Sequence, residues 1–243
     1  MMHAKLPSRT QKLHNLMLRC SRHILTLCFA AALVVGCSTE TKESSASAGN
    51  SLSGSSEQEQ ISSADSEPPQ TDKPTFRSIP FGAEKAKIRE WQESDPMTTG
   101  ADYLAYRGQV GGLSALWAYY FTSESQRFAR AAYIFVEQHA NENLYIDDYK
   151  NVQSILTDKY GSPTDGEGMI WRDDLYQDDP SEYGFAISIG DLIYQKIWET
   201  DSLKIFHTLE GDNYEVEHTV QYQYLPLSEA LEKESRQAQQ ENF

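Results

Sequence analysis

The chain has 243 residues, a formal net charge of −15 at pH 7 and only three cysteines. This acidity argues against nucleic acid as a partner, because binding to phosphates depends on clustered Lys and Arg. It also argues against a polybasic surface that lies on anionic lipid. The part expected to fold, about 150 residues, suits one domain or two small fused units.

Residues 1–36 have the pattern of a signal peptide. All their charged residues are basic, and the apolar run of residues 24–36 is too short for a membrane span, which needs about 20 residues. Met1 and Met17 are both possible starts. Removing five positive charges from a net charge of −15 leaves a mature chain at −20.

The apolar run ends in Val34-Val35-Gly36-Cys37, followed by Ser38. This motif resembles the lipobox of bacterial lipoproteins, which implies that Cys37 becomes the acylated first residue of the mature protein. In that family a Ser after the cysteine, where inner-membrane proteins usually have Asp, implies the periplasmic face of the outer membrane. The alternative is an ordinary secretory signal with an incidental cysteine. Either cleavage removes Cys20 and Cys28, so no disulfide is possible within the mature chain.

Residues 37–75 are expected to form the lipidated cysteine and a disordered, Ser-rich tether. This stretch has almost no apolar residues, so it cannot bury enough surface to offset the entropy of ordering. Its typical end-to-end distance is on the order of 35 Å.

A first α+β unit is predicted for residues 76–145. A helix is expected over residues 83–93 and is stopped by Pro96. Aromatic-rich strands are expected at residues 102–106, 115–121 and 128–136, with turns at residues 107–112 and 122–127.

A second α+β unit is predicted for residues 146–225, with a helix over residues 147–160 that ends at Gly161 and Pro163. Further segments cover residues 168–176, 185–199 and 203–210. Residues 214–225 alternate between apolar and polar and predict a strand with one buried and one wet face. Residues 226–243 read as a polar C-terminal helix or tail. The expected fold class is α+β, an antiparallel sheet with two helices packed on one face.

The two units share an order of helix, aromatic strand and hairpin, which indicates an internal duplication. The helix followed by "LTDKYGSP", an aromatic strand and a hairpin resembles modules of SmpA/OmlA (BamE-like) lipoproteins and of β-lactamase-inhibitor-protein-like proteins. The resemblance implies tandem modules that bind protein. The first unit has "ESDP" where the second has the Lys-Tyr-Gly-x-Pro turn.

Two histidines are expected to meet across the last hairpin. A turn at Asp212-Asn213 would place His207 opposite His218, although Gly211-Asp212 is a rival turn. Such a pair could bind a metal or sense pH, but no third ligand has a recognisable spacing. A packed, hydrogen-bonded neutral pair is therefore preferred, and no metal or other cofactor is predicted.

An acidic loop and the aromatic strands complete the candidates. The loop carries Asp165, Glu167, Asp173, Asp174, Asp178 and Asp179, which predict a solvated face in preference to a calcium site or the carboxylate pair of a glycosidase. No nucleophile signature is present. The aromatic residues exceed what two helices need as core partners, so four of them are candidates for binding a partner: Trp117, Tyr119, Tyr133 and Trp198.

These observations predict a non-enzymatic lipoprotein, anchored in the outer membrane and facing the periplasm, that binds another protein of the cell envelope. The first alternative is an inhibitor of a periplasmic hydrolase, which would present a rigid exposed loop. A carboxylate-based enzyme acting on envelope glycan is the second alternative.

Overall fold

The computed structural model describes residues 73–164 and 168–240, and only the backbone of residues 232 and 234–240. The predicted signal peptide, Cys37 and the tether up to residue 72 lie outside the described residues. The described residues belong to one compact unit. None of their helices is long and apolar enough to cross a membrane.

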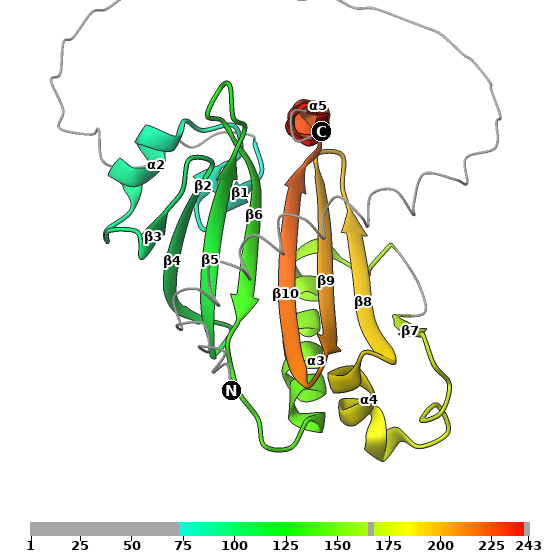
Figure 1. Cartoon of the computed structure of the whole chain (residues 1–243). Helices are drawn as coiled ribbons and strands as arrows, with labels where there is room; N and C mark the ends of the chain where they lie inside the picture. The colour runs from blue at the N-terminus through cyan, green and yellow to red at the C-terminus, as the bar shows by residue number, and fades with distance from the viewer. Residues whose placement is uncertain (1–72, 165–167, 241–243) are drawn as a thin grey trace, which may run out of the picture. The chain divides into compact units, whose positions relative to one another are not determined.

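Eight strands form one antiparallel sheet in the order β3-β4-β5-β6-β10-β9-β8-β7 (Figure 1). The strands are β3 (Thr98–Thr99), β4 (Tyr103–Val110), β5 (Leu113–Phe121), β6 (Phe128–Phe135), β7 (Met169–Trp171), β8 (Leu192–Glu199), β9 (Leu203–Asp212) and β10 (Glu215–Tyr224). A separate two-stranded sheet consists of β1 (Thr75–Phe76) and β2 (Ile79–Pro80). The predicted antiparallel α+β fold is therefore confirmed.

The described residues contain four α-helices, where two helices on the sheet and a C-terminal helix or tail were expected. They are α2 (Lys85–Trp91), α3 (Asn143–Tyr160), α4 (Tyr183–Ile189) and α5 (Leu225–Gln240), and the short 3-10 helix η1 (Pro180–Glu182) precedes α4. The predicted helices correspond to α2 and α3, and α3 begins four residues earlier than expected. The segment 185–199 divides into a helix and a strand because Gly190, at φ 92°, ends α4 in the left-handed conformation.

The sheet consists of two meanders, β4-β5-β6 and β8-β9-β10, which meet where β6 pairs with β10. Figure 1 shows α3 on the side of the sheet behind β10 and β9, and α4 next to the lower end of α3, at the lower ends of β9 and β8. Alternate residues of each strand point to this side. Tyr119, Ala131 and Tyr222 are neighbours there, and they build a core that includes Phe76 and Val152.

The last hairpin has a different register from the predicted one. Asp212 pairs with Glu215, so the turn residues are Asn213 and Tyr214, and both predicted turns are wrong. Gly211 lies within β9, where an added Cβ would collide with the backbone carbonyl of Ile187 in α4. The glycine therefore permits the close approach of a helix and does not form the turn.

The polar face of β10 is not wet, contrary to the prediction from its alternation. Thr219, Gln221 and Gln223 are less than a tenth exposed. As a central strand, β10 has neighbours on both sides, and these polar residues lie opposite Ile134, Ala132 and Arg130 of β6.

Candidate functional site

The four aromatic residues predicted to bind a partner lie on the helix-covered face of the sheet. Tyr119 and Trp198 are at most 1% exposed, Trp117 is 7% exposed and Tyr133 is half-buried. The Trp198 indole donates a hydrogen bond to the carbonyl of Gly161 at 2.8 Å. Their burial assigns these residues to the core, because the rings of both halves are needed to fill the space beneath the helices.

The two predicted histidines do meet, although they are diagonal neighbours. His207 lies opposite Val220 and His218 opposite Leu209, and the two-residue shift in register keeps both on the same face. Their Nε2 atoms are 2.9 Å apart. The Tyr149 ring stacks on His207 at 3.9 Å between centroids, and Phe135 lies 4.3 Å from His218.

Burial keeps both histidines neutral. It lowers the pKa of His218 to about 3, and burial followed by the charge of His218 lowers the pKa of His207 well below its usual value. The Nδ1 atom of His207 has no hydrogen-bond partner. A hydrogen there would be a buried donor without an acceptor, which favours the tautomer in which His207 donates through Nε2 to His218. The predicted packed, hydrogen-bonded pair is confirmed, and the lowered pKa values favour its neutral form.

Metal binding gains no support from this pair. No cluster of three or more possible metal ligands occurs in the parts of the chain that the structure describes. A structural zinc site takes four ligands, and the pair supplies two. Phe135 and Tyr149 occupy the space beside the rings.

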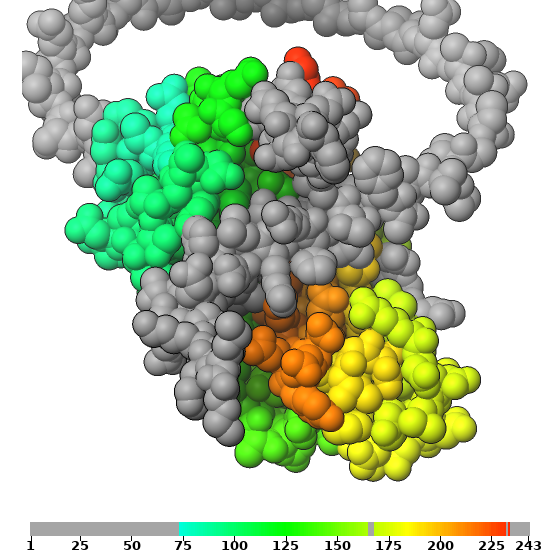
Figure 2. Space-filling view, in the orientation of Figure 1, coloured from blue at the N-terminus to red at the C-terminus, as the bar shows by residue number. Residues whose placement is uncertain are grey.

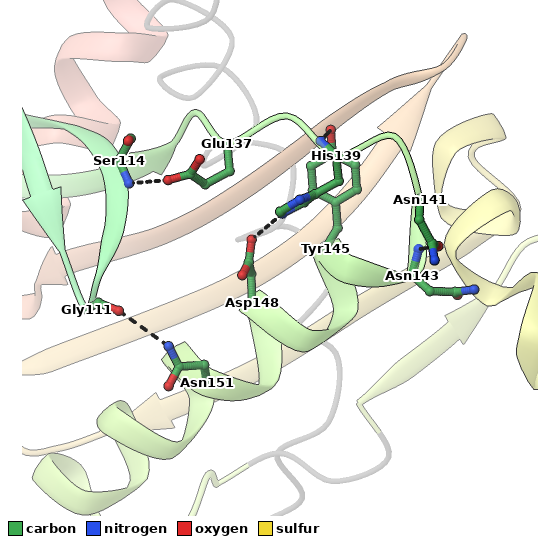
Figure 3. A network of polar contacts seen from close by, with 9 residues as sticks. All are labelled: Gly111, Ser114, Glu137, His139, Asn141, Asn143, Tyr145, Asp148 and Asn151. Carbon is green, nitrogen blue, oxygen red and sulfur yellow. Dashed lines mark hydrogen bonds and ion pairs between the residues drawn. The ribbon is translucent and has the colours of Figure 1, made fainter.

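A second histidine contact lies in the connector between β6 and α3 (Figure 3). His139 Nε2 is 2.7 Å from Asp148 Oδ2, and the His139 backbone N–H donates to the Tyr145 hydroxyl at 3.1 Å. A carboxylate that orients a histidine is also found beside general bases. However, the hydrogen bonds of His139 within residues 73–164 and 168–240 involve only Asp148 and Tyr145.

Further hydrogen bonds extend this network to both halves of the molecule (Figure 3). The Ser114 N–H donates to the Glu137 carboxylate, and the Asn151 amide donates to the carbonyl of Gly111 at 3.4 Å. Asn143 accepts a hydrogen bond from the Gly184 N–H at 2.9 Å. We call these contacts the connector network, and their positions indicate that it fixes α3 against β5 and α4.

An open depression of about 400 Å³ lies beside α2, with Lys85 and Arg89 in its lining. Lys85 Nζ donates to the carbonyls of Gly100 and Ala101 at 2.7 Å each. Its ammonium group is therefore occupied by backbone oxygens. Two other groups in the lining also have partners, since the Ser125 hydroxyl is 2.6 Å from that of Thr122 and the Glu84 carboxylate is 3.2 Å from the Arg127 guanidinium.

The described part of the acidic loop is held by capping hydrogen bonds. Asp173 accepts from the N–H of Leu175 at 3.0 Å, and Asp179 accepts from the N–H and the hydroxyl of Ser181 at 3.1 and 2.6 Å. Asp174 and Asp178 are exposed, in agreement with the predicted solvated face. Asp165 and Glu167 lie outside the described residues.

Apolar side chains lie in and next to this loop, and we name Leu175, Tyr176, Phe185 and Tyr214 the aromatic tip. Tyr176 and Phe185 are half-buried. Leu175 is 73% exposed and Tyr214 is 70% exposed. The Phe185 ring lies between Tyr176 and Tyr214, at 5.5 and 6.3 Å between centroids. Figure 2 shows the yellow surface that includes α4 next to the orange surface of the β9–β10 hairpin.

The backbone of Tyr214 is strained and fixed in place. Its φ is 63°, in the left-handed region that Gly or Asn adopts at lower cost. Its N–H donates to the carbonyl of Ser188 at 2.9 Å, which ties the turn to the end of α4. A strained, exposed tyrosine costs stability, so we regard the aromatic tip as the candidate site.

Sequence reasoning missed this site. The alternation of residues 214–225 predicts a strand that includes Tyr214, and no helical period is visible around Phe185. The available signal was the pair Asn213-Tyr214, where a two-residue hairpin turn favours Asn-Gly.

The chain matches no protein-family model, and neither a curated protein nor a solved structure matches it. The resemblances to bacterial lipoproteins and to SmpA/OmlA modules therefore stay predictions.

Proposed function

We propose that this chain is a lipoprotein, held at the periplasmic face of the outer membrane by acylated Cys37, that binds another envelope protein through the aromatic tip. The role is non-enzymatic. The long segment between Cys37 and β1 would let the folded unit reach a partner at a distance from the bilayer.

The aromatic tip is the observation that supports this proposal. Its two most exposed members, Leu175 and Tyr214, are large apolar residues with little contact of their own to stabilise the fold. Tyrosine is enriched among the residues that contribute most to protein–protein binding. A tyrosine in a strained backbone conformation would be retained at position 214 if its side chain is needed to bind a partner.

The arrangement of the sheet also supports the proposal that the two halves are related units. Each half contains a helix followed by a three-stranded meander, and the meanders pair through their last strands, β6 and β10. Such an arrangement would be expected of the tandem organisation that the resemblance implies, although β7 and α4 have no counterpart of the same kind in the first half.

The anchor is tested by mass spectrometry of the protein extracted from its native membrane. We expect a chain that begins at Cys37 with acyl groups on the cysteine. The variant Cys37→Ser should leave the membrane fraction. An unmodified Cys37, or a retained leader, would contradict the anchor.

Binding through the aromatic tip is tested by photo-crosslinking in intact cells. A photoreactive phenylalanine derivative at position 214 should capture a defined protein, whereas the same probe at Glu93, beside α2 at the opposite end of the sheet (Figure 1), should not. Equal capture at both positions, or none at 214, would overturn the proposal.

Inhibition of a periplasmic hydrolase is the second candidate. It is favoured by the β9–β10 turn, which is exposed and also fixed by the hydrogen bond from Tyr214 to Ser188. The purified chain is added to the free enzyme that crosslinking identifies as the partner. If the turnover of that enzyme is lost at a one-to-one ratio, the chain is an inhibitor and not a simple binding protein.

A further inference from the structure

The aromatic tip has a strongly acidic surrounding. Residues 168–191 contain six acidic residues and one basic residue, Arg172. The Arg172 guanidinium already lies 4.0 Å from the Glu210 carboxylate. Leu175 is placed between the exposed pairs Asp173-Asp174 and Asp178-Asp179.

These carboxylates are held in a defined loop. Besides the caps of Asp173 and Asp179, the Tyr183 hydroxyl donates to the carbonyl of Gln177 at 2.8 Å, and the Asp179 N–H donates to the carbonyl of Tyr176 at 3.1 Å. A loop fixed before binding loses less conformational entropy when a partner docks. The charges are therefore arranged beside the apolar surface in advance.

Both kinds of side chain at this end of the molecule favour the same ligand chemistry. Carboxylates attract Lys and Arg and repel an anionic membrane surface. The faces of Tyr and Phe rings also attract ammonium and guanidinium groups. An apolar side chain on the partner could cover Leu175 and Phe185.

We propose that the aromatic tip binds a cationic segment of a protein partner, whose Lys or Arg side chains lie among Asp173, Asp174, Asp178 and Asp179 and whose apolar side chain packs against Leu175 and Phe185. This inference rests on the proposed binding function and names the chemistry of the partner.

The test uses synthetic peptides and the full acylated chain in detergent. Fluorescence anisotropy should show binding of a peptide of Lys, Arg and Leu, and no binding of a peptide of equal length in which Glu replaces each cation. Raising NaCl from about 50 to about 500 mM should weaken binding by roughly tenfold or more.

Two matched variants distinguish the effect of the carboxylates at the aromatic tip from the effect of the net charge of the whole chain on peptide binding. The replacement of all four loop aspartates by Asn keeps the oxygens that cap Leu175 and Ser181, and it should weaken peptide binding roughly tenfold. The control removes four acidic groups elsewhere and should bind as the natural chain does: Glu93→Gln, Asp95→Asn, Asp102→Asn and Asp201→Asn.

Several outcomes would overturn the inference. These are equal affinity for the two peptides, an equal effect of both variants, or stronger association with vesicles of anionic phospholipid than with the cationic peptide. Displacement of the peptide by about 1 mM Ca²⁺ alone would assign the carboxylates to a cation site instead. Capture at position 214 that does not depend on the four aspartates would refute this inference and leave the proposed function standing.

Discussion

The two hairpins β4–β5 and β9–β10 have two-residue turns of the same length but different chemistry. Gly111 and Gly112 form the first turn at φ 60° and 83°, and Asn213 and Tyr214 form the second at φ 50° and 63°. Glycine adopts this conformation without strain, whereas tyrosine does not. The turn of the first hairpin is therefore unstrained, whereas the turn of the second hairpin is less stable and exposes an aromatic ring.

The interiors of the two halves differ as well. Aromatic and aliphatic side chains fill the core beside β4, β5 and β6, whereas the core beside β9 and β10 contains the His207–His218 pair. Polar groups at this depth are costly unless they are paired. The second half is thus the part of the molecule that acid should affect most.

The largest effect is expected from a core ring. Tyr119→Ala should lower the free energy of unfolding by about 3–5 kcal/mol, because it leaves a cavity at a fully buried site. Urea denaturation measures this change. Tyr214→Ala, which removes the same ring from the exposed tip, should change it by less than about 1 kcal/mol. Similar losses for both variants would contradict the division into core and tip.

Acid should destabilise the second half through the histidine pair. The folded-state pKa values of His207 and His218 are lowered, so the unfolded chain takes up protons first as the pH falls. The contribution of the pair to the free energy of unfolding is fully present above about pH 6.5. As the pH falls below this value, the contribution should decrease by roughly 1.4 kcal/mol per pH unit for each histidine. For His218 the decrease continues until the pH approaches its folded-state pKa of about 3. Urea denaturation at a series of pH values measures the slope. A double replacement of the pair by Leu should reduce it.

The connector network should have a smaller effect. Asp148→Asn should cost about 0.5–1.5 kcal/mol, because the contact with His139 is about four-fifths shielded from solvent. A double-mutant cycle with His139→Gln isolates the pair. Additive losses would show that the two side chains do not interact.

The smallest change in stability, and the most informative, is expected at the tip. Tyr214→Gly relieves the left-handed strain and should raise the free energy of unfolding by a few tenths to about 1 kcal/mol, while binding of the cationic peptide is weakened. Gly112→Ala is the matched change in the other hairpin. It should lower the free energy of unfolding by about 1 kcal/mol, because alanine is strained at the φ of 83°. The added Cβ meets no atom within 4 Å, so the loss reports backbone strain and not a steric clash. Loss of stability in Tyr214→Gly would refute a functional reason for the tyrosine.

Periodicity predicted the sheet, α2 and α3, because these elements each bury one regular face. It failed at α4, where seven residues are too few to show a helical period and the stop signal is the conformation of Gly190. The register of β9–β10 depended on contacts between Gly211 and Ile187 and between Tyr214 and Ser188. Such contacts between distant segments are invisible in a local pattern.

The candidate site was harder to predict than the fold. The meeting of His207 and His218 could be predicted, because a shift of two residues preserves the face of a strand. The choice of Trp117 and Trp198 as surface residues failed, since composition does not reveal how much ring area the helices cover. The aromatic tip required the knowledge that Tyr176, Phe185 and Tyr214 converge from a loop, a helix and a turn.

The pairing of β6 with β10 has a consequence for how the chain reaches this fold. Residues 128–135 are synthesised long before residues 215–224, which pair with them along the middle of the sheet. Until the end of the chain arrives, one side of β6 presents unpaired backbone groups, an edge that invites association with other chains. A nascent or truncated product that stops before residue 215 should therefore aggregate or need a chaperone, whereas the finished chain closes this seam with its own last strand.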